Sequence, residues 1–133
     1  MSHIEIPVRV YIEDTDAGGI VYYVNYLKFM ERARSELMRE LGYRKAALFD
    51  DALKFVVHSL DLRYHAPAQL DDLLTVTAKV IKVGRAFVAF EQTVQLDSQL
   101  LCAGHIKVAC VGRDDGKPRP LPGQLTSALD TND

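Results

Sequence analysis

Two carboxylates, a pair of glycines and the start of a long helix fall within one short stretch of the chain. Asp14 and Asp16 follow an apolar strand, and Gly18-Gly19 permits backbone angles that other residues avoid. The first turn of a helix carries free N–H groups and a partial positive charge, and both stabilise an anion. A carboxylate held beside such a helix end suits nucleophilic or general-base chemistry.

The helix that positions this stretch is predicted over residues 24–41, because its apolar residues recur at helical spacing. Asn25 is the expected N-cap, and Gly42 is the expected glycine after the C-cap. The strand before the carboxylates is predicted over residues 4–13 by alternation, and Pro7 indicates an edge position.

Further strands are predicted after the helix, and short connections make the last three an antiparallel meander. These strands cover residues 54–65, 73–83, 86–96 and 100–111. Short helical turns are predicted at 45–50 and 124–129, a loop at 113–122, and a frayed tail at 131–133. The pattern predicts an α+β fold, in which a curved antiparallel sheet wraps the long helix within one domain, residues 1–133, whose residues 120–133 form a loop and tail.

The bulk composition excludes several classes of protein. The 133 residues carry a net charge of -2, so neither nucleic-acid nor membrane-surface binding is indicated. No apolar run approaches the roughly 20 residues of a membrane span, and the N-terminus lacks a secretory signal. Cys102 and Cys110 share one predicted strand, roughly 26 Å apart, so we expect free core thiols and a cytoplasmic location. The four histidines lack metal-ligand spacing.

Three sequence blocks together resemble the 4-hydroxybenzoyl-CoA thioesterase family of hotdog-fold proteins. They are VYIEDTDAGGIVYYVNY at residues 10–26, FMERAR at 29–34, and YHAPA at 64–68 with LDD at 70–72. The similarity extends over residues 8–112 and is greatest to the Tol-Pal-associated acyl-CoA thioesterase (YbgC) subgroup. It implies a hotdog fold that dimerises by joining sheets edge to edge, as a homodimer or homotetramer. It also implies hydrolysis of acyl-CoA thioesters with no metal and no bound cofactor.

In this resemblance the family's catalytic carboxylate falls on Asp16, and its aromatic or histidine position falls on Tyr23. Asp16 would act as nucleophile or as general base, while the Tyr23 backbone N–H polarises the carbonyl and its phenol orients water. Many relatives have His at position 23 and Tyr at position 12, where this chain has Ile12. The structural alternatives are a turn-forming or capping role for Asp16 and a packed aromatic role for Tyr23.

The same resemblance implies substrate-binding roles for six more residues. They are Gly18 and Gly19 against the acyl group, His58 and Ser59 along the acyl and pantetheine channel, and Lys82 and Arg85 at the CoA phosphates. Alternation places the histidine on the apolar face of its strand with Val56 and Leu60, so it can equally be a satisfied core histidine. The glycines can form an ordinary turn, and the two cations can be a solvated hairpin tip.

Two other functions remain open at this point. One is a hotdog dehydratase or isomerase, although the chain lacks the local histidine motif of those enzymes. The other is a non-catalytic module that binds acyl groups or acyl carrier protein in the cell-envelope Tol-Pal system. Acyl carrier protein is also an alternative acyl donor for a thioesterase, since it shares the pantetheine arm with CoA.

Overall fold

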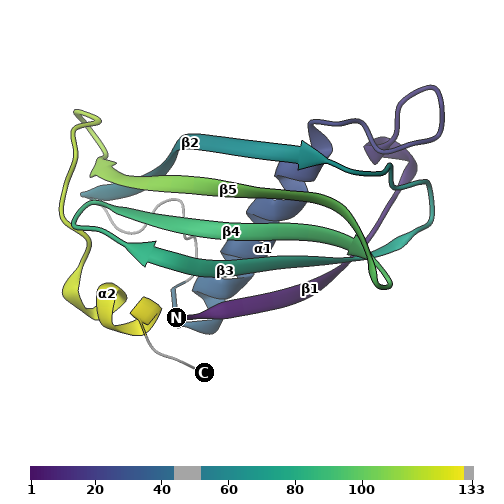
Figure 1. Ribbon diagram of the computed structural model, residues 1–133. Helices are drawn as coiled ribbons and strands as arrows, with labels where there is room; N and C mark the ends of the chain where they lie inside the picture. Colours follow the sequence, from purple (N-terminus) through teal and green to yellow (C-terminus); the bar gives the residue numbers. More distant parts are fainter. Residues whose placement is uncertain (44–51, 131–133) are drawn as a thin grey trace.

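The computed structural model describes residues 1–43 and 52–130, in which a long helix lies against one face of a five-stranded antiparallel sheet (Figure 1). The strands are β1 (His3–Arg9), β2 (Leu53–Tyr64), β3 (Leu73–Val83), β4 (Phe87–Leu96) and β5 (Gln99–Gly112). The helices are α1 (Asn25–Glu40), α2 (Gly123–Asp130) and the 3₁₀ turn η1 (Ile12–Asp14). The strand order β1-β3-β4-β5-β2 confirms the α+β prediction and the meander. The turn and tail predicted at 45–50 and 131–133 lie outside the described residues.

The helix α1 packs its apolar stripe against β1, β3 and β4. Its buried residues include Phe29, Met30, Ala33 and Leu37, which are at most 2% exposed. The helix ends as predicted at Gly42, whose φ is +97°. The N–H of Tyr43 donates to the Met38 carbonyl at 2.9 Å, and that of Gly42 donates to the Arg39 carbonyl at 3.0 Å. This is the Schellman arrangement that glycine makes possible.

Two predictions at the start of the chain are wrong. The first strand stops at Arg9 rather than at residue 13, because the chain turns into η1 at Ile12; the Val10 N–H still donates to the Asp72 carbonyl at 2.9 Å. Asn25 is also not the N-cap: Val24 occupies that position without a side-chain cap, and the Asn25 amide donates to Asp14 instead. Pro7 does lie on an edge strand, as predicted.

A β-bulge in β2 interrupts the predicted alternation of that strand at His58. Val57 pairs with Val108 and Ser59 pairs with Lys107, so His58 is an extra residue between them. The prediction that His58 shares the apolar face with its even-numbered neighbours is therefore wrong. β2 approaches β5 closely, because a Cβ on Gly104 would overlap the backbone oxygen of Asp61.

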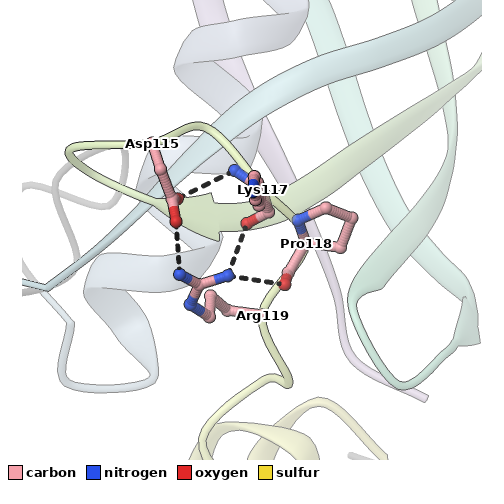
Figure 2. Close-up of polar contacts among 4 residues, drawn as sticks. All are labelled: Asp115, Lys117, Pro118 and Arg119. Carbon is pink, nitrogen blue, oxygen red and sulfur yellow. Dashed lines mark hydrogen bonds and ion pairs between the residues drawn. The ribbon is translucent and has the colours of Figure 1, made fainter.

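The connection after β5 is a tight loop closed by one carboxylate (Figure 2). Asp115 accepts the Lys117 N–H at 3.0 Å through one oxygen and contacts the Arg119 guanidinium at 2.6 Å through the other. The Lys117 N–H and then the Arg119 side chain lower the pKa of Asp115. The loop leads to α2, whose Leu125 and Leu129 are fully buried in the core.

Two further expectations concern the whole chain. Cys102 and Cys110 are both buried and free, as predicted. Burial raises the pKa of the Cys102 thiol to about 11. No helix in residues 1–43 or 52–130 is long and apolar enough to cross a membrane.

Candidate active site

The loop that connects β1 to α1, here called the acidic loop (residues 11–22), is organised around a buried carboxylate. Asp14 is 6% exposed. One of its oxygens accepts the Tyr11 N–H at 2.9 Å, and the other accepts the Asn25 side-chain amide at 3.0 Å. Its backbone carbonyl also accepts the Tyr22 N–H at 2.9 Å. Asp14 thus holds the loop through hydrogen bonds, and it ties the loop to the first residue of α1.

The segment between β2 and β3 holds the other side of the acidic loop. The Val21 N–H donates to the Ala68 carbonyl at 2.8 Å, and the Leu70 N–H donates to the Gly19 carbonyl at 3.2 Å. The Ala68 N–H in turn donates to the Tyr26 hydroxyl at 3.0 Å. Burial raises the pKa of Tyr26, although the Ala68 hydrogen bond opposes this. Residues 64–72, the third block of the sequence resemblance, therefore hold residues 10–26, the first block, in place through backbone hydrogen bonds.

Asp16 lies at the exposed tip of the acidic loop. Its Oδ1 accepts the Gly18 N–H at 2.8 Å, and its own N–H donates to the Ile20 carbonyl at 2.9 Å. Gly19 has φ of +81°, which other residues adopt at a cost. The turn-forming role that we kept as an alternative thus exists, but it occupies only one carboxylate oxygen. Among the described residues, Oδ2 of Asp16 has no hydrogen-bond partner.

Tyr23 follows the acidic loop and immediately precedes the first turn of α1. Its side chain is 60% exposed, and its ring centroid lies 5.0 Å from that of Tyr22 and 6.4 Å from that of Tyr64. The Tyr64 hydroxyl donates to the Tyr23 backbone carbonyl at 3.0 Å. Within the described part of the chain, the Tyr23 N–H makes no hydrogen bond. Three exposed rings and a free N–H group therefore lie at the start of the helix.

His58 and Ser59 are both exposed, on the edge strand of the sheet. The core-histidine alternative for His58 is therefore wrong. His58 is the extra residue of the bulge, and Ser59 resumes the pairing opposite Lys107.

Lys82 lies near the end of β3, and Arg85 lies in the turn between β3 and β4. Figure 1 shows this turn at the opposite end of the sheet from the connection between β1 and α1. β3 starts at Leu73, directly after the segment that holds the loop, and it ends at Val83. One chain therefore does not bring these cations to Asp16.

A third cation, Lys107, lies near Lys82 and was not predicted from the sequence. The ammonium groups of Lys82 and Lys107 lie 5.8 and 4.1 Å from the centre of the Phe87 ring. The alternation of each strand could have predicted this contact, since it places Lys107 and Phe87 on the outer face of neighbouring strands. No group of three or more His, Cys, Asp or Glu side chains in residues 1–43 and 52–130 is placed to hold a metal ion.

The arrangement of one long helix against a five-stranded antiparallel sheet defines a hotdog-fold protein. The family model of the Thioesterase superfamily matches residues 18–103, and the chain belongs to that superfamily. It is 44% identical to the acyl-CoA thioesterase YbgC of Haemophilus influenzae, over 92% of this chain and 91% of that protein. It is 39% identical to the acyl-CoA thioester hydrolase YbgC of Escherichia coli O157:H7, over 91% of each chain.

Solved structures agree with this placement. A probable thioesterase from Bartonella henselae superposes with a TM-score of 0.83 at 33% identity, covering 91% of this chain and all 100% of that one. A 1,4-dihydroxy-2-naphthoyl-CoA thioesterase from Synechocystis superposes with a TM-score of 0.88 over 96% of each chain. Its 19% identity supports the fold alone.

Proposed function

We propose that the chain hydrolyses acyl-CoA thioesters to the free acid and CoA. The observation that carries the proposal is Asp16, whose carboxylate is held by the Gly18 N–H through one oxygen at 2.8 Å. The second oxygen remains available for a substrate. Relatives with 39% and 44% identity over nine-tenths of the chain are named as acyl-CoA thioester hydrolases, which supports the same activity.

In the proposed reaction, Asp16 attacks the thioester carbonyl or removes a proton from the attacking water. The carbonyl oxygen would accept a hydrogen bond from the Tyr23 N–H at the positive end of α1. A fixed donor of this kind stabilises the developing oxyanion by about 3 kcal/mol. The exposed Tyr23 phenol would orient the water or the carboxylate.

Each route breaks the carbon–sulfur bond. If Asp16 attacks, CoA leaves and water then hydrolyses the mixed anhydride, which releases the free acid, regenerates Asp16 and supplies the proton of the CoA thiol. If Asp16 acts as base, it passes the proton taken from water to the leaving CoA sulfur.

We also propose that the site is completed by a second copy of the chain, joined through β2. This strand is an unpaired edge of 12 residues. It exposes Val56, Val57 and Leu60 by 38–47%, and a long apolar edge of this kind calls for a covering partner. Antiparallel pairing of two β2 strands would turn the second sheet end for end. Lys82 and Arg85 of the second copy would then lie at the same end as the acidic loop, where they bind CoA phosphates.

The test incubates the protein with short, branched, aromatic and long acyl-CoAs and measures the free thiol that is released. Asp16→Asn should lower kcat by about 10²- to 10⁴-fold, because it removes the nucleophile or base. The asparagine keeps an oxygen for the Gly18 N–H, so the thermal stability should hold. Asp114→Asn, an exposed carboxylate on the loop after β5, is the matched control.

Each alternative function has its own outcome in this experiment. Hydration of an enoyl-CoA without thiol release would identify a dehydratase, and acyl-CoA binding without turnover would identify a binding module. Acyl carrier protein thioesters, run beside the CoA panel, decide which donor is preferred. Absence of thiol release from every acyl-CoA contradicts the proposal.

A further inference from the structure

A cavity of about 200 Å³ lies on the helix side of the sheet, at the end away from the acidic loop. It is enclosed by the second half of α1, the start of β2, the facing strands β4 and β5, and α2. Its apolar walls include Met38, Phe55, Val57, Val88, Val108 and Leu125. No step of the proposed hydrolysis uses this space.

Two charged residues also line the cavity: Glu31, which is exposed, and Arg34, which is half-buried. Arg34 donates through one guanidinium nitrogen to the Gln92 side-chain oxygen at 2.9 Å. Gln92 is fully buried, and its amide donates to the carbonyls of Met30 and Thr77, each at 3.0 Å. One guanidinium nitrogen of Arg34 is therefore bonded into the core through Gln92.

The volume of the cavity defines the size of its occupant. An apolar cavity of about 150 Å³ holds a benzene molecule, so about 200 Å³ accommodates roughly eight carbon atoms in proportion. This matches an alkyl chain of medium length. The phosphates and adenine of CoA are too polar for these walls and would stay outside.

The position of the cavity points to a substrate bound on another copy. In one chain, Val57 in the cavity wall and Tyr64 beside Tyr23 are separated along β2 by roughly 20 Å. The centre of β2 falls at His58 and Ser59, and its exposed apolar side chains lie on both sides of that point. Antiparallel pairing about this centre brings the Tyr64 end of one strand beside the Phe55 end of the other.

We propose that this cavity holds the aliphatic acyl tail of a substrate whose thioester is bound at the acidic loop of a second copy. The proposal rests on the proposed function and on its β2 dimer, and it names the substrate class as medium-chain, unbranched acyl thioesters. The acyl tail would run from the loop of one chain across the paired β2 edges into the other chain.

The first test fills the cavity. Ser35→Leu on α1 and Val108→Phe on β5 each add carbon atoms to its walls. Either variant should lower the ratio of kcat/KM for decanoyl-CoA to that for propionyl-CoA by about tenfold or more. Arg39→Leu, on the exposed side of the same helix, is the matched control and should leave the ratio unchanged. An unchanged ratio in both filled variants overturns the proposal.

The second test decides whether the tail crosses between copies. Heterodimers of an Asp16→Asn chain and a Val108→Phe chain are purified with two tags. They should hydrolyse decanoyl-CoA at one of their two sites, because the intact Asp16 faces the open cavity of the other copy. Heterodimers of wild-type with the double variant should not hydrolyse it. The reverse pattern places the acyl tail within one chain and contradicts the proposal.

A binding measurement separates this inference from the proposed hydrolysis. Decanoic acid is titrated calorimetrically into the Asp16→Asn dimer and into the same dimer carrying Val108→Phe. Binding to the first that is lost in the second supports the cavity even where no thiol is released. Equal binding to both, or binding to neither, overturns the cavity assignment whether or not the wild-type protein is a hydrolase.

Discussion

The two ends of the sheet are built by different means. At the acidic-loop end, the buried Asp14 and the segment around Ala68 hold the loop and the start of α1 through several hydrogen bonds of 2.8–3.2 Å. At the opposite end, the ammonium groups of Lys82 and Lys107 lie near the Phe87 ring, and a largely apolar cavity lies behind β4 and β5. The first end offers a positioned carboxylate, and the second offers charge and apolar volume.

This difference matches the demands of a thioesterase reaction. Bond-making requires atoms held to within fractions of an ångström, which a hydrogen-bonded loop provides. Binding an acyl tail or a diphosphate tolerates more freedom, since apolar contact and charge act over longer distances. One chain separates the two requirements, so a two-fold pairing that brings unlike ends together would supply both at each site.

The largest expected effect distinguishes the two carboxylates of the acidic loop. Asp14→Ala leaves the Tyr11 N–H and the Asn25 amide without their partner, and should cost about 3 kcal/mol of unfolding free energy. Asp16→Ala removes one exposed hydrogen bond and should cost under about 1 kcal/mol while abolishing thiol release. Urea denaturation and the thiol assay measure the two effects.

Asp14→Asn serves as the intermediate control, because it keeps an oxygen acceptor but replaces the charge. Its stability should lie between that of Asp14→Ala and that of wild type. If the two alanine variants lost equal stability, the distinction between a structural and a chemical carboxylate would fail.

The next prediction tests whether β2 is the dimer contact that brings the acidic-loop end of one copy beside the opposite end of the other. Gly104→Ala places a Cβ against the backbone oxygen of Asp61 and the side chain of Leu62, so β2 must shift. Overpacking of this kind costs about 2 kcal/mol. We expect a lower urea midpoint and a weaker dimer in analytical ultracentrifugation. Gly123→Ala, where a Cβ meets nothing within 4 Å, is the control and should change neither.

Much of the fold follows from local sequence signals. The bounds of β3 agree with the prediction at both ends, and Gly42 ends α1 as predicted, because alternation and the glycine cap act within a few residues. The bulge at His58 and the early end of β1 were missed. The bulge depends on pairing with β5, and the end of β1 depends on the turn into η1; alternation encodes neither.

The candidate site divides in the same way. The Asp16 block was recognisable because its residues are contiguous in the sequence. The cavity joins side chains from α1, β2, β4, β5 and α2, and its existence depends on how those elements pack. Lys107 was missed because its neighbour Phe87 lies twenty residues earlier, on the adjacent strand.

A smaller effect concerns the cations at the hairpin end. Replacing Lys82 and Arg85 together by Ala should raise KM for acyl-CoA several-fold, because exposed charge pairs contribute about 0.2–1 kcal/mol each. kcat should be unchanged. A thioester of N-acetylcysteamine, which lacks the CoA phosphates, is the control substrate and should show no change in KM. An equal change for both substrates would remove the phosphate role from these residues.

The smallest effect lies in the loop after β5, at the same end of the sheet. The Lys117 N–H and the Arg119 guanidinium lower the pKa of Asp115 from its ordinary value of 3.8. A carboxyl with a depressed folded-state pKa contributes stability above its unfolded pKa, and this contribution is lost as the pH falls through the folded value. Wild type should therefore lose more stability than Asp115→Asn when the pH of a urea denaturation is lowered from about 5 to about 3. These two pH values lie about one unit above and below the ordinary pKa of an aspartate. Asp114→Asn controls for net charge alone. A parallel loss in wild type and Asp115→Asn would show that this loop does not depend on the carboxylate charge, whereas the acidic loop depends on Asp14.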